Sequence, residues 1–292
     1  MAVREEVAPG VARERAHDEK QEPTSAVRER EPLPGHASDL PPLPAAAEAL
    51  LDDGLERLGL SGGAGPGTAS RLPEGAREAL VDHARLLIAW TAAINLTAIR
   101  EPEAIVREHI LDSLAAVPIL RMRGIDAILD IGSGGGFPGL PIAIALPAER
   151  ALLVESIGKK ARFLETVVAA VGIRDRVRVA PMRAEELAAP GRERGAWPAV
   201  TARAVSGLAD LAELALPLLA PRGIFVAWKR VPVDAELRAA APMIAALGGG
   251  RPVVLPVTLP GLEDHILIVI EKVGPTPPAY PRDPARRRRA RG

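Results

Sequence analysis

The sequence predicts an α/β protein built on a doubly wound, mostly parallel sheet of seven strands, with a helical portion before it. From residue 125 onward, short runs of β-type composition alternate with runs of helical period, which is typical of βαβ units. The last two β-type runs have no helix between them, so we expect them to pair antiparallel at the edge of the sheet. Apolar residues make up 48% of the 292 residues and aromatic residues 2%, which indicates a core of aliphatic side chains.

The first 45 residues are expected to form a disordered extension. They hold nine acidic and six basic side chains, and their sequence has neither helical nor strand period. Apolar residues then recur at helical spacing in three runs, and glycines between residues 62 and 67 separate the first run from the second. Residues 46–120 are therefore predicted to be a helical portion packed on the sheet domain, with helices over 45–60, 74–94 and 102–118.

Residues 121–273 are predicted to form the sheet domain, and residues 274–292 form a tail rich in Pro and Arg. Strands are expected over 125–131, 151–155, 176–180, 199–203, 223–228, 252–258 and 265–271. Helices are expected between most of the strands, over 139–146, 158–171, 184–189, 207–219 and 232–247.

The composition excludes several classes of site. The chain has no cysteine, which rules out disulfides, thiolate metal sites and cysteine nucleophiles. Its five histidines lack H-E-x-x-H spacing, so we expect no catalytic zinc. The N-terminus has no apolar signal segment, and no apolar run reaches the roughly 18–20 residues of a membrane helix. A cytoplasmic protein without a metal and without membrane contact is therefore expected.

A glycine-rich loop, LDIGSGGGFPG, follows the first predicted strand over residues 129–139. Its glycines allow a tight turn and the close approach of a ligand. The dinucleotide-binding fingerprint needs a third glycine where Phe137 stands. The frame D-x-G-x-G-x-G, the form of this loop in S-adenosylmethionine-dependent methyltransferases, fits Asp130, Gly132, Gly134 and Gly136.

Two carboxylates accompany this loop. Glu155 ends the second predicted strand, where an acidic group can accept hydrogen bonds from both ribose hydroxyls of a nucleoside. Asp130 is expected to order the loop, to accept a hydrogen bond from the amine of the cofactor, or both. Together the loop and the carboxylates predict a site for S-adenosylmethionine. The alternative is a glycine-rich turn that binds nothing.

Further motifs surround this loop: WTAAINLTA over 90–98, REHILDS over 107–113, ESIGKKARFL over 155–164, RAEE over 183–186, TARA over 201–204 and WK over 228–229. With the F-P-G run of the loop, they resemble the motifs of the ribosomal RNA small subunit methyltransferase G family, also called glucose-inhibited division protein B. The resemblance covers about residues 46–272. Two positions depart from it, because Arg230 stands where the family usually has Gly, and Asp264 where it usually has Arg.

The resemblance implies a Rossmann-like sheet and the methylation of N7 of one guanine in 16S ribosomal RNA. It implies S-adenosylmethionine as the cofactor and the small ribosomal subunit as the partner. We also expect a monomeric enzyme. The residues then expected at the cofactor are Asp130, Gly132, Gly134, Gly136, Phe137, Glu155, Ser156, Ala184, Glu185 and Arg203. Phe137 has a simpler interpretation as a core side chain.

The residues also agree with chemistry at N7. Enzymes that methylate an exocyclic amine carry [DN]-P-P-[YF] after the fourth strand, where this chain has TARAV from Thr201. Pyrimidine C5 enzymes use a cysteine. N7 of guanine has a free lone pair and bears no proton, so it can attack the methyl group directly, and alignment alone contributes roughly 7–11 kcal/mol in oriented reactions. We therefore expect no general base.

Four residues are candidates for positioning the substrate. Arg203, at the end of the fourth strand, is expected to position the cofactor and the base; the alternative is a pair with an acid of the RAEE motif, Glu185 or Glu186. A bidentate Arg contact would cover N7, so its contact is expected to be to O6 or to phosphate. RNA contacts are expected from Arg107, His109 and Lys229, although a helix-packing histidine and a solvated lysine are the simpler alternatives.

The tail ends in six Arg and one Asp within eleven residues. Such a run binds phosphate without sequence preference, and a tail of no consequence is the alternative. Three other functions are weighed against the main one: a methyltransferase acting on another RNA, a protein or a small molecule, a NAD-dependent oxidoreductase, and a module that binds without catalysis. Phe137 in the glycine loop argues against NAD.

Overall fold

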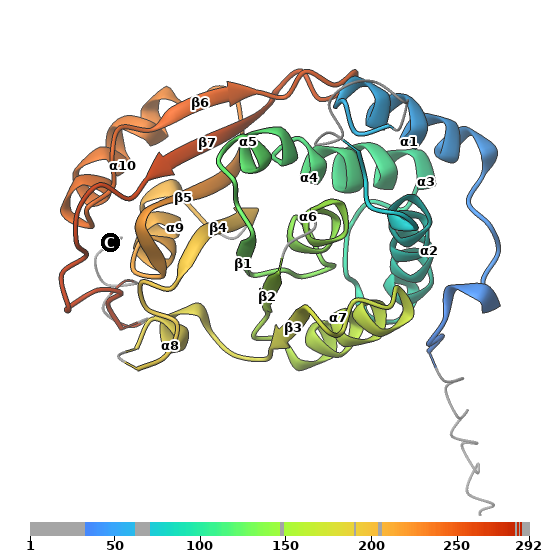
Figure 1. Cartoon of the computed structure of the whole chain (residues 1–292), viewed down its shortest axis with the longest axis horizontal. Coiled ribbons are helices and arrows are strands. Elements are labelled where there is room, and N and C mark those ends of the chain that lie inside the picture. The colour runs from blue at the N-terminus through green and yellow to red at the C-terminus, as the bar shows by residue number, and fades with distance from the viewer. Residues whose placement is uncertain are drawn as a thin grey trace, which may run out of the picture. The chain divides into compact units, whose positions relative to one another are not determined.

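The computed structural model describes residues 33–61, 71–146, 149–189, 191–203, 206–283, 285 and 287. Residues 1–32 of the predicted extension, the glycines expected to break the chain over 62–67, and most arginines of the tail lie outside the described residues. The described part forms one seven-stranded sheet with helices on both faces (Figure 1), which confirms the predicted α/β class. Within the residues described, no helix combines the length and the apolar character that crossing a membrane requires.

The sheet has the strand order β3-β2-β1-β4-β5-β7-β6. Neighbouring strands from β3 to β5 are parallel, whereas β7 is antiparallel to both β5 and β6. The antiparallel pair predicted at the edge is therefore confirmed. The strands are β1 (Ala127–Ile131), β2 (Arg150–Val154), β3 (Val177–Ala180), β4 (Trp197–Arg203), β5 (Leu219–Arg230), β6 (Val253–Pro256) and β7 (His265–Glu271).

Five helices follow the strands: α6 (Gly139–Ala145), α7 (Gly158–Ala170), α8 (Ala184–Leu187), α9 (Leu208–Ala215) and α10 (Asp234–Ala246). Successive residues of a strand point to opposite faces of a sheet, and two apolar clusters fill the two faces. Ile128 and Ala199 belong to the cluster that contains α6 and α7. Their neighbours Leu129 and Val200 belong to the cluster that contains α9 and α10.

The helical portion contains η1 (Ala37–Asp39), α1 (Ala45–Arg57), α2 (Ala76–Ile94), α3 (Pro102–Ile105), η3 (Val106–Leu111), α4 (Asp112–Leu114) and α5 (Val117–Met122). The helix predicted over 102–118 is divided: residues 106–111 form the π-helical turn η3, and α4 ends at Leu114, with two residues between it and the start of α5 at Val117. A π turn adds a residue to the helix and changes the direction of the side chains after it, and such turns are frequent at functional sites.

Residues 33–44, which the composition assigned to the extension, pack on α2. The indole of Trp90 donates to the carbonyl oxygen of Pro34 at 2.8 Å, and Arg85 Nε donates to that of Pro41 at 2.9 Å. Ala37 and Leu43 are buried in the core. Side chains of α2 therefore supply the hydrogen bonds that this segment lacks by itself.

The helix predicted over 207–219 is also shorter than expected. It ends at Ala215 because Leu219 already pairs with Trp197 in the sheet. A buried ion pair then joins this helix to the segment after β7: Glu213 has no exposed surface, and Arg282 Nη2 lies 2.6 Å from its Oε2. The segment up to Asp283 is thus fastened to α9.

Two glycines at helix starts provide a matched test of the packing between α6 and the sheet. A Cβ added to Gly139 would lie 2.6 Å from Asp130 Cβ and from Leu153 Cδ2, whereas one added to Gly158 meets nothing within 4 Å. Overpacking of this kind costs about 1–3 kcal/mol. We expect Gly139→Ala to lower the free energy of unfolding by that amount in urea titrations. Gly158→Ala should leave it unchanged or raise it, and equal stabilities of the two variants would contradict the packing.

Candidate active site

Two neighbouring cavities lie at the carboxyl ends of the parallel strands. Strand order reverses between β1 and β4, and ligands of open α/β sheets bind in the crevice at such a point. The first cavity, of about 220 Å³, is lined by residues that include Gly132, Ser156, Ala184 and Glu185. The second, of about 330 Å³, is lined by residues that include His109, Asp112, Arg203, Trp228 and Lys229.

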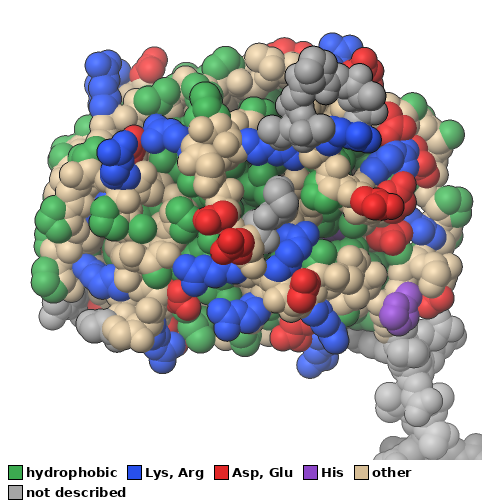
Figure 2. Space-filling view, in the orientation of Figure 1, with side chains coloured by type: hydrophobic (Ala, Val, Ile, Leu, Met, Phe, Trp, Pro, Cys, Tyr) green, Lys and Arg blue, Asp and Glu red, His purple; other side chains and the backbone are tan. Residues whose placement is uncertain are grey.

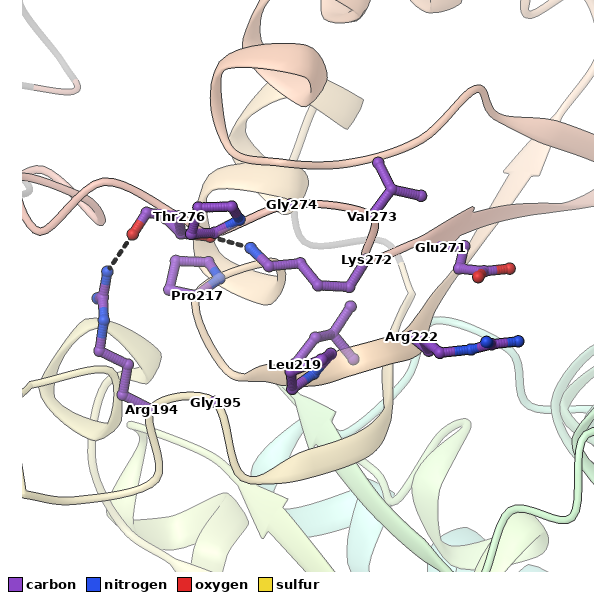
Figure 3. A pocket seen from close by; sticks show the side chains of 12 residues that line it. Arg194, Gly195, Pro217, Leu219, Arg222, Glu271, Lys272, Val273, Gly274 and Thr276 are labelled. Carbon is purple, nitrogen blue, oxygen red and sulfur yellow. Dashed lines mark hydrogen bonds between the residues drawn. The ribbon is translucent and has the colours of Figure 1, made fainter.

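A larger cavity, of about 740 Å³, lies at the opposite end of the strands, where β5 begins and β7 ends (Figure 3). Two of its basic side chains make hydrogen bonds that hold the segment after β7. Arg194 donates to the carbonyl oxygen of Thr276 at 3.1 Å, and Lys272 donates to that of Leu247 at 2.7 Å. None of the predicted site residues lines this cavity, so size alone does not identify the site.

The glycine loop depends on a backbone that other residues rarely adopt. Gly132, Gly134 and Gly136 have φ angles of 71°, 56° and 96°, a region that glycine enters without steric cost. The amide of Gly132 donates to Val154 of β2 at 2.8 Å, and the amide of Gly136 donates to Ser133 at 2.7 Å. The loop is therefore a fixed turn between β1 and α6.

Glu155 joins this loop to the end of β2. Its Oε2 accepts from the amide of Gly134 at 3.0 Å, and its Oε1 accepts from that of Ile157 at 2.7 Å. The residue is 6% exposed. Each oxygen of an ionised carboxylate can accept a further hydrogen bond, so the group retains acceptor capacity next to Val154 and Ser156, which line the first cavity.

Asp130, in β1, makes hydrogen bonds to β4 and to the first residue of α6. It has no exposed surface; its Oδ1 accepts from the hydroxyl of Thr201 at 2.7 Å, and its Oδ2 accepts from the amide of Gly139 at 3.2 Å. Burial raises the pKa of this carboxyl to about 6, against the hydrogen bonds from its neighbours. The loop-ordering role that the sequence suggested is the one these contacts describe.

The ring of Phe137 lies between two histidines. Its centroid is 4.6 Å from that of His83 and 4.7 Å from that of His109, with interplanar angles of 20° and 21°. The guanidinium of Arg203 lies 5.2 Å from the same centroid. Since Phe137 is 6% exposed, its ring packs the loop against α2 and η3.

Asp112 connects several of the residues that line the second cavity. Its Oδ2 pairs with Arg203 Nη1 at 2.9 Å, its Oδ1 lies 2.9 Å from His265 Nδ1, and its carbonyl oxygen accepts from the indole of Trp228 at 2.8 Å. Arg203 also donates to the carbonyl oxygen of Glu108 at 2.8 Å. The helical portion is thereby joined to β4, β5 and β7.

The alternative partners weighed for Arg203 are wrong. Glu185 pairs with Arg287, and Glu186 accepts from the amide of Arg183 at 3.2 Å. The sequence did not identify the partner because Asp112 lies 91 residues before Arg203.

Hydrogen bonding fixes the tautomers of His109 and His83. Arg203 has only donors, so His109 Nδ1, at 3.1 Å from its Nη2, is the acceptor, and Nε2 donates to the hydroxyl of Thr97 at 2.7 Å. His83 Nε2 donates to the carbonyl oxygen of Gly135 at 2.8 Å. Burial, with the positive charge of Arg203, lowers the pKa of His109 to about 3 and that of His83 to about 4. Both rings are neutral at pH 7.

The residues expected to contact RNA have partners within the protein. Lys229 Nζ lies 2.6 Å from Glu236 Oε1 and 3.0 Å from the carbonyl oxygen of Ser206. His109 is held between Thr97 and Arg203, as described above. Arg107 lies beside Gly261, where an added Cβ would come within 2.8 Å of its Cδ.

The two positions that depart from the family pattern pair with each other. Arg230 Nη1 lies 3.4 Å from Asp264 Oδ2, and its Nη2 lies 3.3 Å from Glu108 Oε2. Among the residues of this cavity, the sequence did not single out Glu108, His265 or the indole of Trp228. The only signal available for His265 was its place at the start of the last strand.

Comparisons with known proteins point to one family. The family model described as rRNA small subunit methyltransferase G (GidB) matches residues 76–254, more than half of the chain. A protein of that name from Roseiflexus sp. (strain RS-1) is 44% identical over 220 residues, covering 74% of this chain and 93% of its own length. Another from Stenotrophomonas maltophilia is 38% identical over 232 residues, covering 78% and 97%.

A solved O-methyltransferase from Bacillus cereus, in complex with SAH, has a TM-score of 0.48 and 17% identity over 65% of this chain and 90% of that chain.

The buried histidine of α2 makes a pH-dependent contribution to stability. Its folded pKa of about 4 lies below the unfolded value of about 6.5, so the unfolded state binds the proton first and stability falls between pH 6.5 and 4. At pH 4 we expect the wild type to have lost about 3 kcal/mol more than His83→Gln, which retains an N–H for Gly135. Urea titrations at each pH measure this difference, and parallel pH profiles would show that His83 is not buried neutral.

Proposed function

The chain belongs to the ribosomal RNA small subunit methyltransferase G family, and on that premise we propose that it transfers a methyl group from S-adenosylmethionine to N7 of a guanine in 16S ribosomal RNA. The observation that carries the proposal is the fixed glycine loop at the switch point of the sheet, bonded through Gly134 to the carboxylate of Glu155. It leaves a first cavity for the cofactor beside a second cavity for a base.

The residues around the first cavity fit S-adenosylmethionine. An added Cβ on Gly134 would have only Gly132 O, 3.8 Å away, within 4 Å, so the backbone there is open to the aminocarboxypropyl arm. The remaining lone pairs of Glu155 suit the ribose hydroxyls. Ala184 and Glu185 are assigned to the adenine, with Ser156 beside them. Asp130 and Phe137 order the loop, with Gly132 and Gly136 forming its turns.

The second cavity suits a guanine that has left its base stack. Trp228 and Arg203 offer flat surfaces, and the carboxylate of Glu108 can accept from N1–H and N2–H, which carry the donors of guanine. Asp112 fixes the guanidinium of Arg203, so its free N–H groups can contact O6 without covering N7. Arg203 is thus assigned a positioning role.

The transfer needs no proton acceptor. When bound, S-adenosylmethionine supplies an electrophilic methyl group on sulfur. The N7 lone pair forms the new N–C bond while the S–C electron pair returns to sulfur, and no proton leaves N7. The low pKa values of His83 and His109 make both rings weak bases, which agrees with a step that needs no base. Alignment by the two cavities supplies most of the rate enhancement.

We assign the RNA contacts to Arg107, His109 and Lys229, with Lys229 exchanging Glu236 for a phosphate. On the face shown in Figure 2, basic side chains are interspersed with acidic ones, so the field there is mixed rather than uniformly positive. The sheet domain, 121–273, carries the cofactor site and the helical portion, 46–120, closes the base cavity. We place a monomeric enzyme in the cytoplasm, where small ribosomal subunits are found.

The direct test uses radiolabelled S-adenosylmethionine and small ribosomal subunits from cells that lack the endogenous enzyme. We expect label in 7-methylguanosine of 16S ribosomal RNA after nuclease digestion. Free guanosine should not be labelled. Label in another nucleoside would overturn the assignment to N7, and no label despite cofactor binding would overturn the assignment to this RNA.

A pair of glycine variants tests the cofactor cavity. Gly134 and Gly172 both have positive φ, 56° and 70°, and neither is crowded, so valine imposes a similar backbone strain of about 1–3 kcal/mol at each. Gly172 lies beyond α7, away from both cavities. We expect Gly134→Val to abolish S-adenosylmethionine binding in calorimetry while Gly172→Val binds normally. Normal binding by Gly134→Val would refute the placement of the arm.

A further inference from the structure

A side chain from the C-terminal tail already stands in the first cavity. Arg287 lines it together with Ser156, Ala184 and Glu185. Its guanidinium pairs with the carboxylate of Glu185, and the two side chains are 10% and 14% exposed. These are the residues to which the adenine end of the cofactor is assigned, so the tail and the cofactor require the same carboxylate.

The tail reaches the cavity from a firm anchor. After β7 the chain returns to the side where α8 and α9 lie (Figure 1). Arg194 donates to the carbonyl oxygen of Tyr280 at 2.7 Å, and Arg282 makes hydrogen bonds of 2.6–3.1 Å to the buried carboxylate of Glu213. Only three residues separate Asp283 from Arg287. A short tether gives a high effective concentration of the guanidinium at the cavity.

The first cavity, with Arg287 in it, is smaller than a cofactor of the size of S-adenosylmethionine needs. Its volume is about 220 Å³, below the roughly 300–1,000 Å³ of pockets that hold drug-sized ligands. S-adenosylmethionine, an adenosine with an amino-acid arm, is of that size. Withdrawal of Arg287 would enlarge the cavity and release Glu185 at the same time.

We propose that Arg287 is a competitive occupant of the cofactor site, and that RNA phosphates withdraw it by binding the arginine run of the tail. This proposal rests on the proposed function, since it takes the first cavity as the cofactor site. The run contains Arg286, Arg287, Arg288, Arg289 and Arg291, a density of positive charge that binds a phosphate backbone through counterion release. RNA binding then raises the affinity for the cofactor, because it increases the fraction of molecules with an open site.

The first test measures S-adenosylmethionine binding by calorimetry with three full-length proteins at low salt. Coupling between two binding events typically changes an affinity by about 5–150-fold, so we expect Arg287→Ala to bind S-adenosylmethionine about tenfold more tightly than the wild type. Arg291→Ala, which removes the same charge from the same run, should bind like the wild type. Equal or weaker binding by Arg287→Ala would overturn the proposal, and equal tightening by both variants would show a charge effect without occupancy.

The second test adds a 20-nucleotide poly(U), which carries the phosphate backbone but no guanine. It should tighten cofactor binding to the wild type towards the value for Arg287→Ala, and it should leave Arg287→Ala unchanged. No effect on the wild type would refute the withdrawal by RNA. Failure of every protein to bind S-adenosylmethionine would overturn the proposed function as well, whereas normal binding that ignores Arg287 would overturn the tail proposal alone.

Discussion

The site depends on one buried carboxylate, that of Asp112, which is 1% exposed. An ionised group in such a position is stable only when it is paired and hydrogen-bonded, and removal of one partner of a buried pair typically costs about 3–5 kcal/mol. Asp112 meets this requirement with Arg203 and His265. The same contacts set Arg203 over Phe137 and beside His109, so the shape of the second cavity follows from the contacts of this one carboxylate.

Elsewhere in the site, burial without a counter-charge favours the neutral form of a titratable group. His83 and His109 stay neutral because water is excluded from their rings, and the pKa of Asp130 is raised for the same reason. The two neutral histidine rings act as fixed dipoles and packing surfaces. Such an arrangement suits the proposed transfer, which moves no proton and depends on holding two reactants in line.

Local patterns in the sequence were sufficient to predict the strands, the alternation of strands and helices along the chain, and the glycine loop. Hydrophobic period and glycine placement are properties of neighbouring residues. They were insufficient for contacts across the fold. Asp112 and His265 are 153 residues apart, and no spacing rule joins them. The π turn at Val106–Leu111 was missed since its apolar residues fit an ordinary helix, and Pro34 was assigned to the extension because its support comes from Trp90. The individual cofactor contacts stay predictions.

The Asp112–His265 pair also constrains how the protein is made. Synthesis proceeds from the N-terminus at about 5–20 residues per second, so the aspartate precedes its histidine partner, 153 residues later, by roughly 8–30 s. During that interval Asp112 lacks the contact with His265 at the start of β7. The second cavity therefore acquires its Asp112–His265 contact late, when most of the chain has been synthesised.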